Sequence, residues 1–471
     1  MLITAGGLLI SLSMSFQLVP HNQVSAHQVG QASAIRPYLT STSLSTPTLY
    51  LPLVVKTCGT CYFIDSNNGS YSNSGTEPDQ PWRTLSKLDK ANLPPGAIVH
   101  LKRGSVWTGI LHVYASGQAD RPITITAYGS GAAPILSNPG DTNNRESVIY
   151  LVGSFIVIDG IQVQDSGTGI DIGSGSHHNI IRNSEISNTG LGIVIMGQDN
   201  LITHNYIHDL RMVVNTPDVD GDDWGADGVN IHNSHNEVSF NRFVNCEAPS
   251  YDFGVGGGAI EIYQIGDDTS IHHNWSFQSA GFMEVSSDGT GSATDVTIFY
   301  NVIINATRFT VIHVSGNYAT QIRNFRVENN TLIDLRAHDP ILGRYIVFSG
   351  TPDPTAYVLR NNIIYISDYY WVATDQFTHQ NNLYYFLNSR TRLGYTLGPD
   401  ELMADPQFLD VASYDFHLKS TSPAINAGRN LGYTEDFDQN PVPTGTVPDL
   451  GAYEYQGNRA GPKSRIISNL P

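Results

Sequence analysis

The feature that most constrains the fold of this chain is a short pattern that recurs along most of its length. In every copy but the last, which begins with His379, an apolar residue is followed by two residues, a polar residue, one further residue and usually a second apolar residue. The polar position is occupied by Asp159, Ser184, Asn205, Asn241, Asn274, Asn301, Asn330, Asn362 and Asn382. Apolar alternation with a period of two, interrupted by a polar turn residue and repeated in this way, predicts stacked coils of short strands.

The preference for Asn at this position fits a corner of such a coil. Asn tolerates left-handed backbone, and its amide can form hydrogen bonds with the Asn of the coils above and below. A β-sandwich or a propeller with accidental Asn spacing is the alternative, but nine aligned copies favour the stack.

The composition narrows the possible partners. Only 14% of the 471 residues are charged, and 25 Lys and Arg stand against 43 Asp and Glu, for a net charge of −18. This balance argues against nucleic-acid binding through phosphate contacts and against docking on anionic membranes. It argues less firmly against anionic polysaccharides, because one local basic subsite could still hold them.

The N-terminal segment resembles an export signal. Residues 2–14 are apolar, and a small-residue cleavage motif stands at Ala32-Ser33-Ala34, although no Lys or Arg precedes the apolar run. We therefore predict a signal peptide over residues 1–34, a Ser/Thr-rich spacer over 35–56 and a secreted protein; a disordered N-terminus is the alternative. No later apolar run is long enough for a membrane span.

The three cysteines give a weak signal. Cys58 and Cys61 form a C-x-x-C pair, which can be a redox pair or half of a zinc site, but the chain has no second pair. In an exported protein a local disulfide is the better interpretation, with Cys246 as a buried free thiol.

Several longer motifs resemble the right-handed parallel β-helix proteins of the pectate-lyase-like superfamily, over roughly residues 62–456. They include Tyr62-F-I-D-S-N-N-G, Pro122-I-T-I-T-A-Y-G, Ser422-P-A-I-N-A-G and Asp449-L-G-A-Y-E-Tyr455. The resemblance implies an all-β solenoid with a short N-terminal capping helix marked by Trp82, Leu85, Leu88 and Leu93. The implied organisation is a cap with the first coils (57–150), central coils (151–400), a closing segment (401–456) and a tail (457–471).

A second strand in each coil places one polar column on the outside. Apolar residues at its second and fourth positions are expected to point inward, so the third position points outward. That position is occupied by Asp171, Val194, Asn230, Glu261, Glu284, His313 and Val347. Neighbouring coils lie about 4.8 Å apart, so Glu261, Glu284 and His313 are predicted to stand side by side.

Two carboxylates at this distance repel, which predicts a raised pKa for one of them unless a cation intervenes. A gap of about 5 Å matches retaining glycoside hydrolysis. Glu284, beside His313, is the predicted acid/base and Glu261 the nucleophile; the reverse assignment stays open, and Asp227 could replace either. The alternative is a solvated acidic face without chemistry.

Further residues are predicted to bind substrate or metal. The substrate-binding candidates are Asp171, Asn230, His232, Tyr263, Trp224 and Arg344. Asp218, Asp220 and Asp222 alternate in one acidic loop as calcium ligands often do, although an EF-hand is excluded because Val229 occupies the twelfth loop position. The predicted reaction requires no cofactor, and Ca²⁺ binding competes with a solvated acidic loop.

The superfamily does not specify the reaction, because it includes lyases, hydrolases, epimerases and adhesins. A polysaccharide lyase or uronate epimerase would need a base, and no Lys stands between Lys102 and Lys419. His313 or His232 would have to serve, with Arg344 holding the uronate carboxylate. A non-catalytic carbohydrate-binding protein is the third possibility. In the favoured interpretation a monomer cleaves a polysaccharide or oligosaccharide as a retaining glycoside hydrolase.

Overall fold

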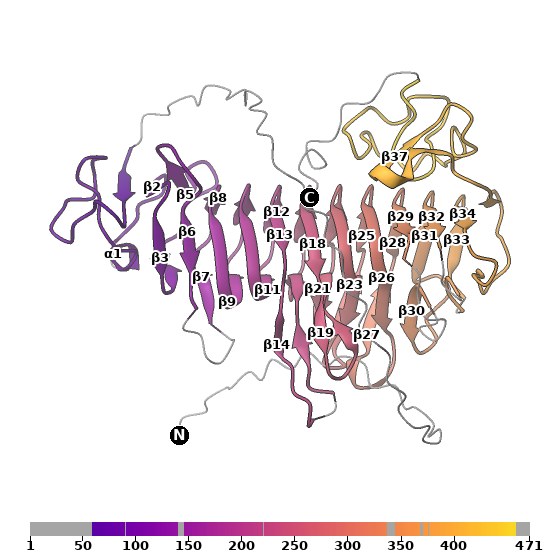
Figure 1. The fold of residues 1–471 in the computed structure, drawn as a ribbon, viewed down its shortest axis with the longest axis horizontal. Helices are drawn as coiled ribbons and strands as arrows, with labels where there is room; N and C mark the ends of the chain where they lie inside the picture. The colour runs from indigo at the N-terminus through magenta and orange to yellow at the C-terminus, as the bar shows by residue number, and fades with distance from the viewer. Residues whose placement is uncertain are drawn as a thin grey trace, which may run out of the picture.

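The chain forms one long stack of β-coils (Figure 1). The computed structural model describes residues 59–89, 91–139, 146–219, 221–336, 344–367, 371–374 and 376–457. The predicted signal peptide and the predicted spacer lie outside these residues. Neighbouring coils pair through parallel strands, which confirms the prediction of an all-β parallel helix.

Each complete coil contributes strands to three faces. The first face is a sheet of 12 strands: β1 (Cys61–Ile64), β2 (Ile98–Lys102), β5 (Ile123–Tyr128), β8 (Ile156–Asp159), β10 (Ile180–Arg182), β12 (Leu201–Thr203), β17 (Glu237–Ser239), β22 (Ser270–His272), β25 (Thr297–Phe299), β28 (Phe325–Glu328), β31 (Tyr357–Arg360) and β33 (Thr378–Gln380).

The second and third faces belong to one sheet, because some of its strands bend around the corner between them. For example, β9 pairs with β6 through Gln162–Gln164 and with β7 through Thr168–Ile172. The strands of this sheet are β3 (Val106–Thr108), β4 (Leu111–Val113), β6 (Ile135–Ser137), β7 (Ser147–Leu151), β9 (Gln162–Ile172), β11 (Glu185–Ile195), β13 (Tyr206–His208), β16 (Asp227–Ile231), β18 (Arg242–Cys246), β21 (Gly258–Tyr263), β23 (Trp275–Ser286), β26 (Val302–His313), β29 (Thr331–Asp334), β30 (Ile346–Ser349), β32 (Ile363–Ile366), β34 (Leu383–Phe386) and β35 (Leu402–Met403).

Smaller elements decorate the stack. They are α1 (Ser86–Asp89), two 3-10 turns at Gly316–Tyr318 and Val411–Ser413, and the strand pairs β14 (Met212–Val214) with β15 (Trp224–Gly225), β19 (Ala248–Ser250) with β20 (Gly254–Gly256), β24 (Gly291–Thr294) with β27 (Thr320–Arg323), and β36 (Phe408–Asp410) with β37 (Asp415–Leu418). In the described part of the chain, no helix is long and apolar enough to cross a membrane.

A column of buried Asn side chains holds the coils together at one corner. The main-chain N–H and the Nδ2 of Asn274 both donate to Oδ1 of Asn301, at 2.9 and 3.0 Å. Asn301 donates in the same way to Asn330, and the column continues to Asn382, whose Nδ2 donates to Glu401. Each amide therefore satisfies its neighbour inside the stack, as the repeat predicts.

Two details of the predicted repeat are wrong. The residue before each column Asn, rather than the Asn, adopts the left-handed backbone, with a φ of 57° at His204 and 48° at Tyr300. The first copy is also shifted: Ser184 aligns with Ile161 and not with Asp159, because Arg182 pairs with Asp159.

The N-terminal end carries a single helical turn, α1, whose Leu88 is buried in the main core together with Trp82, Leu85 and Leu93. Its capping role stays a prediction. Cys61 is disulfide-bonded, while Cys58 lies outside the described residues. Cys246 is free and buried, as predicted.

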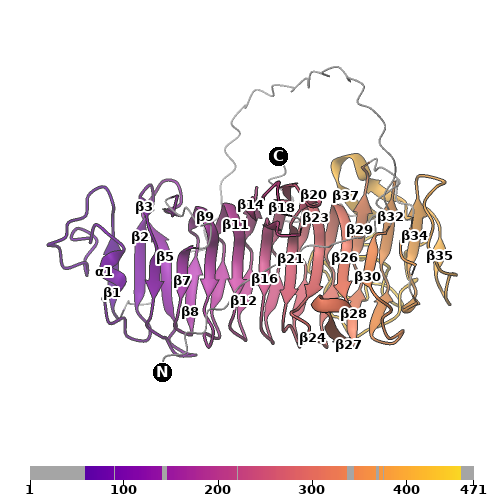
Figure 2. The ribbon, with the colours of Figure 1, turned by 90° about the horizontal axis from the view of Figure 1, so that it is seen from below.

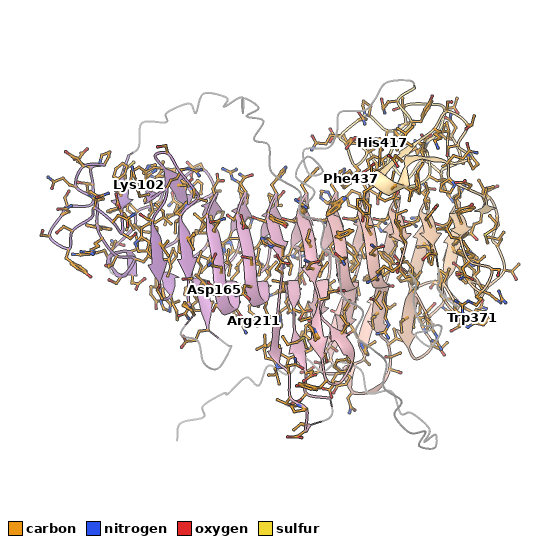
Figure 3. The ribbon with its side chains drawn as sticks, viewed as in Figure 1. Lys102, Asp165, Arg211, Trp371, His417 and Phe437 are labelled. Atoms are coloured by element: carbon orange, nitrogen blue, oxygen red, sulfur yellow. The ribbon has the colours of Figure 1, made fainter. Side chains whose placement is uncertain are left out.

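The C-terminal segment packs against the outside of the second face. Phe416, Phe437 and Tyr453 form a core with Trp275 and Ile333, which point outward from that face. Trp275 is fully buried there, so it presents no ring face to a ligand. Figure 3 labels His417 and Phe437 within this segment, on the side of the stack opposite Arg211.

Two consecutive coils carry insertions at the same corner, between the second and third faces. Residues 209–226 separate β13 from β16 and contain the hairpin β14–β15, and residues 247–257 separate β18 from β21 and contain β19–β20. The next coil has no insertion at this corner, because β23 runs through it as one strand. Both hairpins project from the same side of the stack (Figure 1).

Candidate functional site

The predicted outward column exists on the third face, where β16, β21, β23, β26 and β30 follow one another in this order (Figure 2). Its register runs Asp171, Val194, Asn230, Glu261 and Glu284 in successive coils. Glu261 and Glu284 are therefore direct partners, which confirms their predicted adjacency.

His313 is displaced from its predicted place in this column. Glu284 aligns with Val311, so His313 stands two residues further along its strand, in the next outward column. His313 nevertheless reaches diagonally to Glu284, with 3.2 Å between its Nε2 and Oε1 of Glu284. Its Nδ1 lies 3.2 Å from Oγ of Ser349.

Three carboxylates and the two inserted hairpins enclose a pocket. Asp227, Glu261 and Glu284 line it on the side of the sheet, and Met212, Trp224 and Phe253 line it from the insertions. Glu261 is only 7% exposed, whereas the side chain of Glu284 is 33% exposed. Of the sequence-predicted residues, the pocket thus unites Asp227, Glu261, Glu284 and Trp224.

Asp227 lines the pocket from the first position of β16. It pairs with Gly258, and Gly281 aligns with the following Arg308. A Cβ atom on Gly281 would find a single atom within 4 Å, the carbonyl oxygen of Arg308 at 4.0 Å, so glycines leave space beside the carboxylates.

The pocket perturbs its acids strongly. Burial raises the pKa of Glu261 to about 8, and the charge of Glu284 acts in the same direction. Hydrogen bonds from Ser286 and Asn230 to the Glu261 carboxylate oppose this shift. Burial also raises the pKa of Asp227 well above its ordinary value, with contributions from Glu261 and Glu284. A pKa of about 8 means that Glu261 holds a proton at neutral pH.

His313 has a raised pKa although it is buried. Burial lowers its pKa, but the hydrogen bond to Glu284 and the charges of Glu284 and Glu261 outweigh that effect. The site thus combines two buried acids that have raised pKa values, Asp227 and Glu261, with a third acid, Glu284, that is in contact with His313.

The remaining substrate-binding candidates occupy different surroundings. His232 and Tyr263 are neighbours beside the carboxylates, with ring centroids 5.4 Å apart, and burial lowers the pKa of His232 to about 4. Asp171 is separated from Asn230 by the coil that carries Val194. Val194 packs with Leu191 of its own strand, β11, and with Val213 of the first insertion. Burial raises the pKa of Asp171 to about 6.

Two arginines continue the outward column that begins with Asp227. Arg308 aligns with Gly281, and the same register places Arg344 beside Arg308. Arg344 is among the residues predicted from the sequence, whereas Arg308 and the pocket residues Met212 and Phe253 are not. Arg308 could have been found from its position alone, because it directly precedes a buried aromatic residue, Phe309, just as Arg344 directly precedes Tyr345.

The acidic loop differs from the predicted calcium set. Asp218 is exposed, and Asp220 lies outside the described residues. Asp222 instead approaches Asp223 and Asp252, with one carboxylate oxygen of each within 4.8 Å of the others. Calcium binding stays a prediction.

Comparisons with known proteins place the fold. No protein-family model matches the sequence. A lacto-N-biosidase of Bifidobacterium longum subsp. longum is 38% identical over 88 residues, which are 17% of this chain and 6% of that protein. The match thus spans a small part of the relative.

Among solved structures, pectate lyase Pel9A aligns with a TM-score of 0.52 at 16% identity, over 84% of this chain and 96% of Pel9A. The GH136 lacto-N-biosidase of Eubacterium ramulus aligns with a TM-score of 0.41 at 14% identity, over 74% of this chain and 67% of that one. By its strand pairing and by its likeness to Pel9A, the chain is a parallel β-helix protein with the fold expected from its repeat.

Proposed function

We propose that the protein is a secreted glycoside hydrolase that cleaves a polysaccharide or oligosaccharide in the pocket of Asp227, Glu261 and Glu284. The observation that carries the proposal is the direct pairing of two carboxylates on adjacent coils, one of them buried with a pKa of about 8. A protonated acid beside a carboxylate is the pair that glycosidic cleavage needs.

The roles follow from burial. Glu261 holds a proton at neutral pH and would donate it to the leaving oxygen. Glu284, more exposed and stabilised by His313, would attack the anomeric carbon. This assignment is the reverse of the one favoured from sequence, which placed the acid beside His313. Asn230 and Ser286 would hold the Glu261 carboxyl in place.

The geometry favours retention of configuration. Adjacent coils stand about 4.8 Å apart, and retaining enzymes place their carboxyl groups about 5 Å apart. An inverting enzyme needs a wider gap for water. Trp224 and Phe253 would offer aromatic faces to the sugar ring, which binds such faces through its C–H groups.

The relatives support carbohydrate as the substrate class. One matching protein is a lacto-N-biosidase and another is a pectate lyase. The reaction proposed here needs no cofactor, and secretion is proposed from the N-terminal segment.

Elimination is the second candidate, and one observation favours it. Arg308 and Arg344 follow the glycines beside the pocket and could bind a uronate carboxylate. In that case His232, whose lowered pKa keeps it neutral, or His313 would remove the proton. A protein that binds glycans without cleaving them is the third candidate.

The test is a panel of plant, algal and microbial glycans incubated with wild-type protein, Glu261→Gln and Glu284→Gln. New reducing ends without ultraviolet absorbance from an unsaturated uronate would support hydrolysis, and that absorbance would support elimination. Glycan binding without turnover, unchanged in both variants, would refute an enzymatic role.

A further inference from the structure

The two inserted hairpins meet at a pair of aspartates outside the catalytic column. The main-chain N–H of Asp223 donates to Oδ2 of Asp252 at 2.9 Å, and the N–H of Asp252 donates to Oδ2 of Asp223 at 3.0 Å. Each carboxylate thus accepts a hydrogen bond from the other residue's main-chain N–H, although the residues are 29 positions apart in the chain. We call this reciprocal pair the clasp.

Further donors are directed at the buried member of the clasp. Ser250 Oγ donates to Oδ2 of Asp223 at 2.7 Å, and the N–H of Thr216 donates to Oδ1 at 2.8 Å. Asp223 is fully buried, so these hydrogen bonds form away from water. They satisfy a buried carboxylate by neutral donors and lower its pKa despite the opposing effect of burial.

The clasp stands next to the aromatic wall of the pocket. Trp224 directly follows Asp223, and Phe253 directly follows Asp252, and both aromatic residues line the pocket. Only two residues, Gly225 and Ala226, separate Trp224 from Asp227. Gly225 has a φ of 116°, and a Cβ there would lie 2.4 Å from the main-chain N of Val213, so the hairpin cannot shift freely at this point.

We propose that Asp223 and Asp252 are positioning residues that fix Trp224 and Phe253 as the sugar-binding wall of the pocket. The inference deepens the proposed function and rests on it for the identity of the ligand as a sugar. We expect the clasp to act on ground-state binding, because Asp223 and Asp252 directly precede Trp224 and Phe253 in the chain, whereas Glu261 and Glu284 belong to strands of the third face. Asp223 also lines the pocket itself.

The clasp also accounts for the acidic cluster without a cation. Three donors, Ser250 Oγ, the Asp252 N–H and the Thr216 N–H, already occupy lone pairs of Asp223, and Thr216 Oγ1 donates to Asp222. A divalent ion would compete with these donors for the same carboxylate oxygens.

A first experiment tests the clasp without using activity. Acrylamide quenching of Trp fluorescence is measured in the wild type, in Asp223→Ala and in both after Trp224→Phe, so that the Trp224 signal is obtained by difference. We expect Asp223→Ala to raise the quenching constant of Trp224 at least about twofold, and Asp252→Ala to do the same. Asp222→Ala, which leaves the clasp intact, is the matched control and should not change it. Unchanged quenching in Asp223→Ala would overturn the proposal.

A second experiment tests the positioning role with a glycan that the wild type cleaves. Asp223→Ala should raise KM about tenfold or more and leave kcat within about threefold, since a uniform loss of binding raises KM alone. Asp223→Asn, which keeps one acceptor oxygen, should lie between. A fall in kcat with unchanged KM would contradict the inference. If the wild type cleaves no glycan, the proposed function fails while the quenching result still decides the clasp.

A chelator separates the clasp from a metal site. Incubation of the wild type with EDTA should leave Trp224 quenching and KM unchanged. If EDTA reproduces the behaviour of Asp223→Ala, and added Ca²⁺ reverses it, the three aspartates hold a cation and the clasp is wrong.

Discussion

Two columns of stacked polar side chains run along the same β-helix, and they obey opposite rules. In the Asn column each amide donates to the next coil and accepts from the previous one, so identical residues satisfy each other. In the carboxylate column Glu261 stands beside Glu284, where identical residues repel when ionised. A stack of Asn side chains stabilises the fold, because each amide both donates and accepts. A stack of carboxylates does not stabilise it, so its presence points to a role other than stability.

Another buried acid, Glu328, differs from Glu261 in its partners. Glu328 is as buried as Glu261, but it is paired with Arg360 and accepts the hydroxyl of Tyr433. Glu261 receives neutral donors and faces further acids. The fold therefore pairs one buried carboxylate with an arginine but leaves Glu261 with neutral donors, which is typical of a functional site.

The largest expected effect is the loss of turnover when a residue of the carboxylate column is replaced. Glu261→Gln and Glu284→Gln should each lower turnover at least about 100-fold, because a positioned acid, base or nucleophile contributes this much or more. Asp171→Asn, on the same column but beyond Val194, is the matched control. Turnover of both Glu variants near the wild-type rate would show that the column is only a surface.

The next largest expected effect is the loss of stability when a residue of the Asn column is replaced. Asn301→Ala removes the Oδ1 that accepts from the main-chain N–H and the Nδ2 of Asn274, of which only the Nδ2 keeps a second acceptor, the carbonyl of Val238. It also removes the Nδ2 that donates to Asn330, while the main-chain N–H of residue 301 still donates to Asn330. Unsatisfied buried groups cost about 1–3 kcal/mol each, so the free energy of unfolding should fall by about 3 kcal/mol. Urea denaturation measures it, with the exposed Asn317→Ala as control. A loss below about 0.5 kcal/mol would contradict a structural role.

A third effect is a dependence of stability on pH. The folded protein holds a proton on Glu261 up to a pKa of about 8, above the ordinary 4.5, so it binds more protons than the unfolded chain between these values. The contribution of Glu261 to stability is full below about pH 4.5 and is lost as the pH rises through 8. Glu261→Gln should therefore be more stable than the wild type at pH 9 by about 2 kcal/mol, on an order-of-magnitude basis, and nearly equal at pH 4.

Thermal melts at both pH values check this prediction. A variant that is less stable than the wild type at pH 9 would show that the Glu261 carboxylate is compensated, and the contrast between the two columns would disappear.

The smallest effect concerns Asp171 itself. Its carboxyl belongs to the column but is separated from the pocket by Val194 and the first insertion. We expect Asp171→Asn to change kcat/KM by less than about threefold. A larger loss, measured on the longest glycan that the enzyme cleaves, would show that the substrate site extends past Val194 to Asp171.

The stack and the Glu261–Glu284 pair could be predicted because both depend on periodicity. Inward apolar pairs fix the register of most coils, and register fixes which outward residues meet. The register failed at β26, where the inward residue is Thr310, a polar residue whose Oγ1 lies 3.4 Å from the hydroxyl of Tyr357 in the core. The pattern of apolar residues therefore shifted by two, and His313 was assigned to the wrong column.

The parts that could not be predicted depend on loops. Nothing periodic relates Asp223 to Asp252, or Trp224 to Phe253, because they lie in insertions of different coils. The same holds for Trp275, which is aromatic and outward-pointing but covered by a C-terminal segment that packs on the side of the stack. Repetition predicts the scaffold, and the contacts between insertions decide the shape of the site.

The most direct test of the central claim is the anomeric configuration of the first product, followed by proton NMR during cleavage of a glycan of known linkage. Two carboxyl groups on adjacent coils, about 5 Å apart, predict that the product first appears with the anomeric configuration of the substrate. First appearance of the opposite anomer, or of an unsaturated sugar, would contradict the assignment of Glu261 and Glu284 as acid and nucleophile.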